Sequence, residues 1–366
     1  MKQHIDPYAS GAQRGNPKRQ SEMGLTWPEP LRSFHVWLLV LALLLAWLSG
    51  PVGAADGRTV AAVRTPGTEA NLWLARVQGA AQRLNYSGNF VYQQGSQLHS
   101  SRISHAVDQS GEHEKLEILD GKSLEYIRHN DELKCYMPDS KLVVIEKRPS
   151  GERFPGLLMS SNADIDAFYK VSRIGADRVA GRACQVTLLE PRDNMRYGYR
   201  LWTDQQTGLL LKAQTINDRG DVIEQIGFTE VTIGENIDRS RFKPNVKSWD
   251  GWRRETLDVT PAELTQSGWT LKNPVPGFQK IREVKRVFAD RREVGQIVYS
   301  DGLANISVFI ETNGTPSATE GDTNLGTINV VSRRHGEFWL TVVGEVPVNS
   351  IRQVASSLEF AKSVPR

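Results

Sequence analysis

The most constraining feature of this sequence is a long series of short runs in which apolar and polar residues alternate. Between residues 86 and 147 the runs include SGNFVYQQ, QLHSSRISHAV and KLVVIE, separated by short turns such as Asp120-Gly121 and Asn130-Asp131. Period-two alternation is typical of half-buried β-strands, and Asp-Gly between two such runs is a strong hairpin signal. The pattern predicts an antiparallel meander.

The alternation stops over residues 147–168, which contain two prolines and two glycines and in which a short helix is expected near Asn162. It then resumes and continues to about residue 233. A sheet of about ten antiparallel strands usually curls or closes. We therefore expect a curved sheet, a half-barrel whose apolar concave face suits a lipid-like ligand.

A helix is expected immediately before the meander. The run EANLWLARVQGAAQRL, residues 69–84, places apolar side chains near helical spacing, which favours an amphipathic helix. Its expected apolar stripe consists of Leu72, Ala75, Val77, Ala80 and Leu84. Together with the helix near Asn162, it would lie under the curved sheet.

A second, smaller domain is expected after residue 258. Residues 235–258 lose the alternation and are rich in charge, Pro and Gly, which is typical of a linker. Thr260-Pro261-Ala262-Glu263 matches a capping box with Pro at the first helical position, so a helix should begin there. Strand-like runs follow, and a final helix is expected near 350–360. The fold class is thus α+β, with an antiparallel C-terminal domain at 259–362.

The N-terminal segment resembles an export signal. Residues 34–48 are almost all apolar, Arg32 precedes them, and Val52 and Ala54 occupy the −3 and −1 positions of a small-residue cleavage site. A cleaved leader over 1–54, with a long n-region, is favoured over a permanent anchor because a spanning helix needs about 20 apolar residues. Initiation at Met23 would give a more ordinary n-region. The expected location is the periplasm.

The charge balance gives little support to nucleic-acid binding. Residues 1–54 contain five of the 45 Lys and Arg and three of the 42 Asp and Glu, which leaves 40 against 39 after cleavage. Nucleic-acid binding needs a clustered positive surface. The near-neutral mature chain therefore does not predict such a partner.

Two cysteines, Cys135 and Cys184, both lie inside strand-like runs. In an oxidising compartment they could form a disulfide, which would close a loop of about 50 residues and stabilise the fold by about 4 kcal/mol. The alternative is two buried thiols that never meet. Spacing in the sequence does not decide between them.

No pattern in the sequence predicts an enzyme. The G-x-S-x-G elbow, the H-E-x-x-H helix and the P-loop are absent. His99 and His105 share a strand face, but six residues along a strand separate them by about 20 Å, too far for one metal ion. We expect no metal site and no cofactor.

Two polar stretches are candidates for a functional site. Arg196 and Tyr197 in the run RYGY could bind an anionic group, but packing of Tyr197 and Tyr199, with Arg196 facing solvent, is favoured. Asp301-Gly302 lies between two strand-like runs, and nothing near it in the sequence would make Asp301 an acid or a base. It is expected to be a hairpin turn.

An ordered set of motifs carries a family resemblance over residues 70–360. The set consists of GNFVYQQ, LDG at 119–121, VAGRACQV, EPRDNMRYGYRLWTDQQTGLLLK, VYSDGLANISVFIE and VVGEVP. In this order, after an export leader, it resembles the RseB/MucB family of periplasmic regulators. The resemblance implies a LolA-like half-barrel over 69–234 and a smaller α+β domain that binds an anti-sigma factor of the RseA/MucA type.

The resemblance also implies a mechanism. Such a regulator shields the periplasmic part of the anti-sigma factor from site-one proteolysis, and a lipid or lipopolysaccharide signal releases it and so triggers the sigma-E envelope stress response. Release requires the lipid to bind the free and the partner-bound forms with different affinities. The alternatives are a LolA-type carrier of lipoprotein or lipid, and a secreted hydrolase. A homo-oligomer remains open.

The resemblance gives candidate residues for both ligands. Phe90 and Tyr92 are candidates for the lipid cavity. The candidates for the partner surface are Arg196, Tyr197, Tyr299, Asp301 and Phe309, of which Tyr299 and Phe309 would be aromatic anchors. For each of these residues, a role in the fold alone is the alternative.

Overall fold

The computed structural model describes residues 69–147, 165–288, 292–312 and 319–361. The expected leader over 1–54 and the expected helix start near Asn162 lie outside these ranges. No helix among the described residues is long and apolar enough to cross a membrane.

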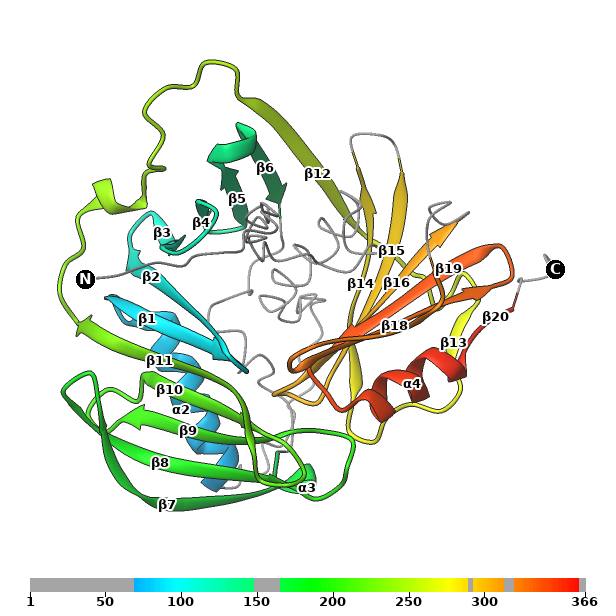
Figure 1. The fold of residues 1–366 in the computed structure, drawn as a ribbon, viewed down its shortest axis with the longest axis horizontal. Helices are drawn as coiled ribbons and strands as arrows, with labels where there is room; N and C mark the ends of the chain where they lie inside the picture. The colour runs from blue at the N-terminus through cyan, green and yellow to red at the C-terminus, as the bar shows by residue number, and fades with distance from the viewer. Residues whose placement is uncertain (1–68, 148–164, 289–291, 313–318, 362–366) are drawn as a thin grey trace, which may run out of the picture.

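Eleven strands form a curved antiparallel sheet in the N-terminal part of the chain (Figure 1), which confirms the predicted meander. Their order across the sheet is β7-β8-β9-β10-β11-β1-β2-β3-β4-β5-β6, so the β1–β11 pairing joins two runs of sequential hairpins. The strands are β1 (Tyr86–Gln94), β2 (Gln97–Asp108), β3 (Gly111–Ile118), β4 (Leu124–His129), β5 (Glu132–Met137), β6 (Leu142–Lys147), β7 (Tyr169–Val179), β8 (Arg182–Pro191), β9 (Gly198–Asp204), β10 (Leu210–Ile216) and β11 (Val222–Ile233).

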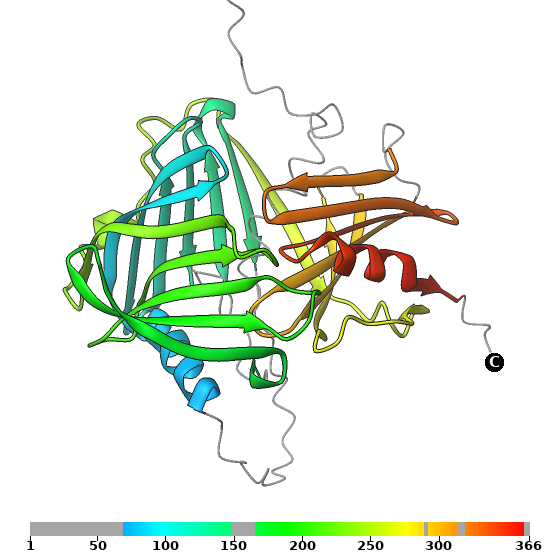
Figure 2. The same cartoon turned by 60° about the horizontal axis from the view of Figure 1, so that its bottom comes forward.

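Helix α2 (Glu69–Arg83) packs against this sheet, as Figures 1 and 2 show. Its existence was predicted, but its buried stripe runs through Ala70, Leu74, Val77 and Ala81, whereas Leu72 is 63% exposed. The buried set follows the i, i+4, i+7 rule and packs against apolar side chains of the strands. The short helix α3 (Ile165–Phe168) leads directly into β7.

The C-terminal part has a second antiparallel sheet with one helix across it. The strand order is β14-β15-β16-β19-β18-β17, and helix α4 (Val348–Ser357) covers one face through a core that includes Ile306, Leu340 and Ile351. The strands are β14 (Gln279–Val287), β15 (Glu293–Ser300), β16 (Asn305–Thr312), β17 (Gly321–Leu325), β18 (Ile328–His335) and β19 (Phe338–Gly344), with a separate pair of β13 (Trp269–Leu271) and β20 (Leu358–Phe360).

Strand β12 (Arg253–Pro261) belongs to both sheets and makes them one continuous sheet of 18 strands. Its first half, 253–257, runs parallel to β6, and its second half, 258–261, runs antiparallel to β14. Beside it, Glu146 of β6 and Arg286 of β14 form a buried ion pair with an O–N distance of 2.5 Å. The end of the expected linker is therefore a strand.

The prediction that a helix begins at the capping box is wrong. Thr260 and Pro261 end β12, where they pair with Lys285 and Val284 of β14, and residues 264–268 form turns. The amide of Ala262 also donates to the Glu283 carbonyl at 3.2 Å. Pairing with β14 thus overrides the local capping signal, and Pro is tolerated because it stands at the end of the strand.

Candidate functional site at the junction of the two sheets

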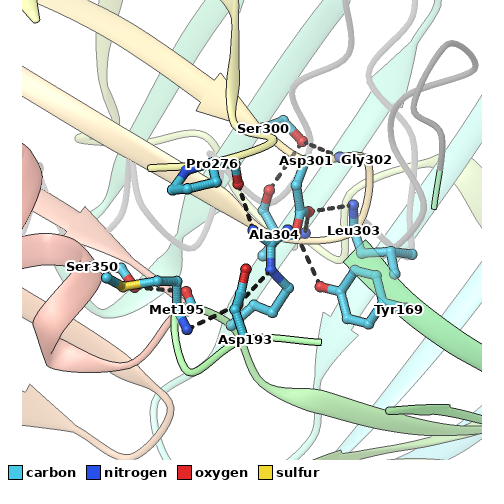
Figure 3. Close-up of polar contacts among 11 residues, drawn as sticks. Tyr169, Asp193, Met195, Pro276, Ser300, Asp301, Gly302, Leu303, Ala304 and Ser350 are labelled. Atoms are coloured by element: carbon cyan, nitrogen blue, oxygen red, sulfur yellow. Dashed lines mark hydrogen bonds and ion pairs between the residues drawn. The ribbon is translucent and has the colours of Figure 1, made fainter. Parts of the chain in front are cut away.

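The turn between β15 and β16 is closed by its own side chains (Figure 3). Asp301 Oδ1 accepts hydrogen bonds from the amides of Leu303 at 3.0 Å and Ala304 at 2.8 Å. Ser300 Oγ accepts from the Gly302 amide and donates to the Ala304 carbonyl, both at 3.0 Å. Gly302 has φ of 99°, which a residue with a Cβ rarely adopts. The predicted hairpin turn at Asp301-Gly302 is confirmed.

The second oxygen of Asp301 reaches across to the N-terminal sheet. Arg196, in the loop between β8 and β9, places Nη1 2.6 Å from Asp301 Oδ2, and both side chains are fully buried. Arg196 Nε also donates to Asp193 Oδ1 at 3.0 Å, and Nη2 donates to the Pro276 carbonyl at 2.5 Å. The favoured expectation that Arg196 faces solvent is therefore wrong, because two carboxylates and a carbonyl replace its water.

Aromatic rings complete the environment of this ion pair. The Arg196 guanidinium carbon lies 4.7 Å from the centre of the Phe168 ring and 5.2 Å from that of Phe278. Such contacts favour a cation over the ring faces. Arg196 is thus held by groups from both sheets, and the ion pair is one of the contacts that join them.

Tyr169 donates its hydroxyl to Asp301 Oδ2 at 3.0 Å. Burial raises the pKa of Tyr169 well above its ordinary value, and the nearby Asp301 charge raises it further. Burial alone would lower the pKa of Arg196, but Asp193 and Asp301 outweigh it and raise the pKa. At neutral pH the phenol therefore remains a donor and the guanidinium remains charged.

Two further contacts lie beside the ion pair. Asn329 Nδ2 of β18 donates to the Tyr197 hydroxyl at 3.2 Å, and Ser350 Oγ of α4 donates to the Met195 carbonyl at 2.6 Å. We call the region of Arg196, Asp301, Tyr197 and these partners the junction. It brings together three of the five residues predicted for the partner surface.

The other two predicted partner residues lie inside the C-terminal part. Tyr299 is 6% exposed and belongs to the core under α4, and Phe309 is 0% exposed and packs with Phe288 and Val294. In this structure neither ring is available as a surface anchor, because each is covered by its own sheet's neighbours. Their contribution is to the fold of the C-terminal sheet.

The two candidates for the lipid cavity lie in different surroundings. Phe90 is 5% exposed and packs in the N-terminal core with Phe228, at a ring-centre distance of 6.0 Å. Tyr92 is half-buried, and its hydroxyl donates to Glu224 Oε2 at 3.0 Å. Phe90 therefore serves the core, and Tyr92 lies near the C-terminal sheet through contacts described below.

The two cysteines are free in the structure, so the disulfide considered above is not formed. Cys135 packs with Tyr126 and Leu133, whereas Cys184 packs in the core that contains Phe90. Burial raises the pKa of the Cys135 thiol to about 12 and also raises that of Cys184. Neither thiol is activated as a nucleophile.

Within the described ranges, one group of side chains has metal-ligand types close together, namely His105, Glu112 and Glu114, whose ligand atoms lie within 4.8 Å of one another. Arg128 Nη2 already bridges the two carboxylates at 2.7 and 3.2 Å, and His105 Nε2 lies 2.9 Å from Glu112. A buried ion-pair network accounts for this group, because the guanidinium supplies the balancing positive charge.

Sequence reasoning missed Tyr169 as a member of the junction. It stands in a strand-like run with no signal of its own, whereas Asp193 could have been suspected from its place three residues before Arg196. The pairing of Arg196 with Asp301 spans 105 residues of sequence, which no local pattern can indicate.

The chain is thus a β-sheet protein of two parts. A curved antiparallel sheet and a second sheet share one strand, and buried polar residues hold the junction between them. The family model described as MucB/RseB N-terminal domain matches residues 69–246, and the model described as MucB/RseB C-terminal domain matches residues 263–359. The chain belongs to the MucB/RseB family.

Two curated relatives similar to this chain are named as regulatory proteins. Sigma factor AlgU regulatory protein MucB of Pseudomonas aeruginosa is 30% identical over 313 residues, which is 82% of this chain and 94% of the relative. Sigma-E factor regulatory protein RseB of Escherichia coli K12 is 24% identical over 292 residues, 78% of this chain and 89% of the relative.

Solved structures agree in fold. A crystal structure of MucB in complex with MucA(peri) is 27% identical with a TM-score of 0.60, covering 80% of this chain and 99% of that one. A crystal structure of MucB alone is 27% identical with a TM-score of 0.58, covering 81% and 100%.

Proposed function

We propose that this protein is a non-enzymatic, periplasmic regulator of a sigma-E-type envelope stress response. It binds the periplasmic part of an anti-sigma factor of the MucA/RseA type and shields that segment from site-one proteolysis. The observation that carries the proposal is the match of both parts of the chain to the family, including 27% identity to a MucB solved in complex with MucA(peri).

The proposal places the lipid signal in the N-terminal sheet, taken as a LolA-like half-barrel over 69–234, and the partner surface on the C-terminal part, 259–362. Lipid or lipopolysaccharide binding would then release the anti-sigma factor. The buried positions of Arg196, Asp301, Tyr299 and Phe309 support a refined role for them. Arg196 and Asp301 hold the C-terminal sheet against the N-terminal one, whereas Tyr299 and Phe309 maintain the fold of the C-terminal sheet itself. The partner is contacted by the surface that these residues support.

Calorimetry tests the partner directly. Mature protein, residues 56–366, is titrated into the periplasmic segment of the host's anti-sigma factor, first alone and then with lipopolysaccharide present. Saturable binding that the lipid weakens is the expected result. A folded protein that takes up lipid but shows no partner binding at tens of micromolar would favour the carrier function instead.

Proteolysis tests the shielding. The site-one protease is given the anti-sigma segment with and without an excess of this protein, and with the protein plus lipopolysaccharide. We expect cleavage to be slowed by the protein and restored by the lipid. Equal cleavage rates in the three reactions would contradict the proposed function.

A further inference from the structure

A second polar contact between the two sheets contains two carboxyl groups and, among the described residues, no basic side chain. Glu224 lies on β11 of the N-terminal sheet, and Glu345 lies between β19 and α4 of the C-terminal part. Thr327, in the turn between β17 and β18, connects them, because its Oγ1 is 2.5 Å from Glu224 Oε2 and 3.1 Å from Glu345 Oε1. Glu224 and Thr327 are buried, at 5% and 0% exposed, and Glu345 is half-buried.

The hydrogen-bond directions require a proton on this pair. A threonine hydroxyl has one proton to donate and can accept two. If Thr327 donates to Glu224, its contact with Glu345 is satisfied only when the Glu345 carboxyl is protonated and donates to Thr327. Glu224 has further donors in the Tyr92 hydroxyl at 3.0 Å and Gln94 Nε2 at 3.4 Å, so the negative charge belongs on Glu224.

The remaining neighbours are neutral or acidic. Gln94 of β1 also donates to the Leu325 carbonyl at 3.2 Å, which adds a direct bond between the two parts. Tyr92, Tyr197 and Tyr199 face the same space, and the Glu224 and Glu345 charges raise the pKa of all three beyond the effect of burial. Asp218 also raises the pKa of Tyr197, and Asp301 also raises that of Tyr199. Among the described residues, no Lys, Arg or His hydrogen bonds to or pairs with either carboxyl.

We propose that Glu224, Thr327 and Glu345 form a proton-dependent contact that holds the two sheets together when one carboxyl is protonated and loosens when both ionise. Two unpaired carboxylates on one hydroxyl would repel each other with no cation to compensate, and separating the two parts would return both to water. The contact thus makes the arrangement of the two parts depend on pH.

The direction of the pH effect follows from burial. Burial raises the pKa of Glu345 well above its ordinary value and the Glu224 charge raises it further, while burial also raises the pKa of Glu224. For an acid whose pKa is raised in the closed form, the stabilisation is present below the ordinary pKa and is lost as pH rises through the raised one. Within that window, loss of one proton changes the ratio of open to closed forms by up to about tenfold per pH unit.

The test measures the separation of the two parts without any partner. Spin labels are attached at Gln109→Cys, in the N-terminal part, and Asn349→Cys, in α4, since both positions are exposed and the native thiols are buried. Pulsed electron resonance then gives the distance distribution between pH 5 and pH 9. We expect a single distance at low pH and a growing population of longer distances as the pH rises.

Variants assign the effect to the pair. Glu345→Gln keeps a donor toward Thr327 at every pH, so the distance distribution should become independent of pH within about twofold in the open-to-closed ratio. Glu230→Gln removes an exposed carboxyl from the same strand as Glu224 and should behave as the parent. If Glu345→Gln does not fold, Glu224→Gln replaces it, since removing the charge of Glu224 should also weaken the pH dependence.

A distance distribution that stays constant from pH 5 to pH 9 would overturn the proposal, and so would an unchanged pH dependence in both variants. Closure at high pH that appears only with Ca²⁺ and disappears with a chelator would also overturn it, because the pair would then hold a metal ion. An effect of this contact on partner binding rests on the proposed function. Because the labelled experiment contains no partner, its failure would leave that function standing.

Discussion

Removal of the Asp301 carboxylate should destabilise the protein more than any single surface ion pair can. Asp301→Ala deletes the acceptor for Arg196 Nη1, for the Tyr169 hydroxyl and for two turn amides. Breaking a buried ion pair by removing one partner costs about 3–5 kcal/mol, because a charge remains buried without compensation. Asp193 still neutralises part of Arg196, so we expect a loss of about 3 kcal/mol in the free energy of unfolding.

Urea unfolding followed by tryptophan fluorescence measures this loss. The matched control is Arg352→Gln, which breaks the exposed pair with Asp322 at 2.6 Å and should cost at most about 1 kcal/mol. The double variant Arg196→Met with Asp301→Leu removes both charges and should recover much of the loss, since apolar replacement of a buried pair is often neutral. Equal unfolding midpoints for Asp301→Ala and Arg352→Gln would refute the buried-pair reasoning. A double variant whose loss of stability exceeds the summed losses of its two single variants would refute it as well.

Three further outcomes are expected. Phe90→Ala should lower the free energy of unfolding by about 3–5 kcal/mol because the ring fills the N-terminal core, and a loss below about 1 kcal/mol in urea unfolding would instead indicate a ring that lines open space. Gly302→Ala should destabilise by about 1 kcal/mol or more in thermal unfolding because φ is 99°, with Gly302→Asn as the milder comparison; no difference between the two would argue against strain in this turn. The native protein should leave a thiol reagent almost unreacted, and both Cys135 and Cys184 should react after unfolding without a reductant; fewer than two thiols in the unfolded protein would reveal a disulfide.

Local patterns in the sequence predicted what is local in the structure. The alternating runs became the strands of the meander, and the helix expected over 69–84 formed over Glu69–Arg83, although Leu72 proved exposed. Which face of that helix is buried depends on the apolar side chains that the strands of the curved sheet present to it. The sequence of the helix alone does not contain that information. The capping box at residue 260 failed for a similar reason, because β14 supplies hydrogen bonds that an isolated segment would not have.

The candidate site was predicted only in its parts. Arg196 and Asp301 were both singled out, yet each was expected at the surface, because a charged side chain is normally solvated unless a partner is known. Their partners come from distant segments: Asp301 lies 105 residues after Arg196, and Tyr169 lies 132 residues before Asp301. Such compensation is visible only once the two sheets are assembled. The same holds for Glu224 and Glu345.

The strand shared between the two sheets bears on how the polypeptide can be divided. If the chain were cut just before β12, the N-terminal fragment would expose the edge of β6, and if it were cut just after, the C-terminal fragment would expose the edge of β14. Bare strand edges are templates for aggregation. Fragments produced separately should therefore be poorly soluble, whereas two fragments produced together, with β12 on either one, should reassociate by strand addition.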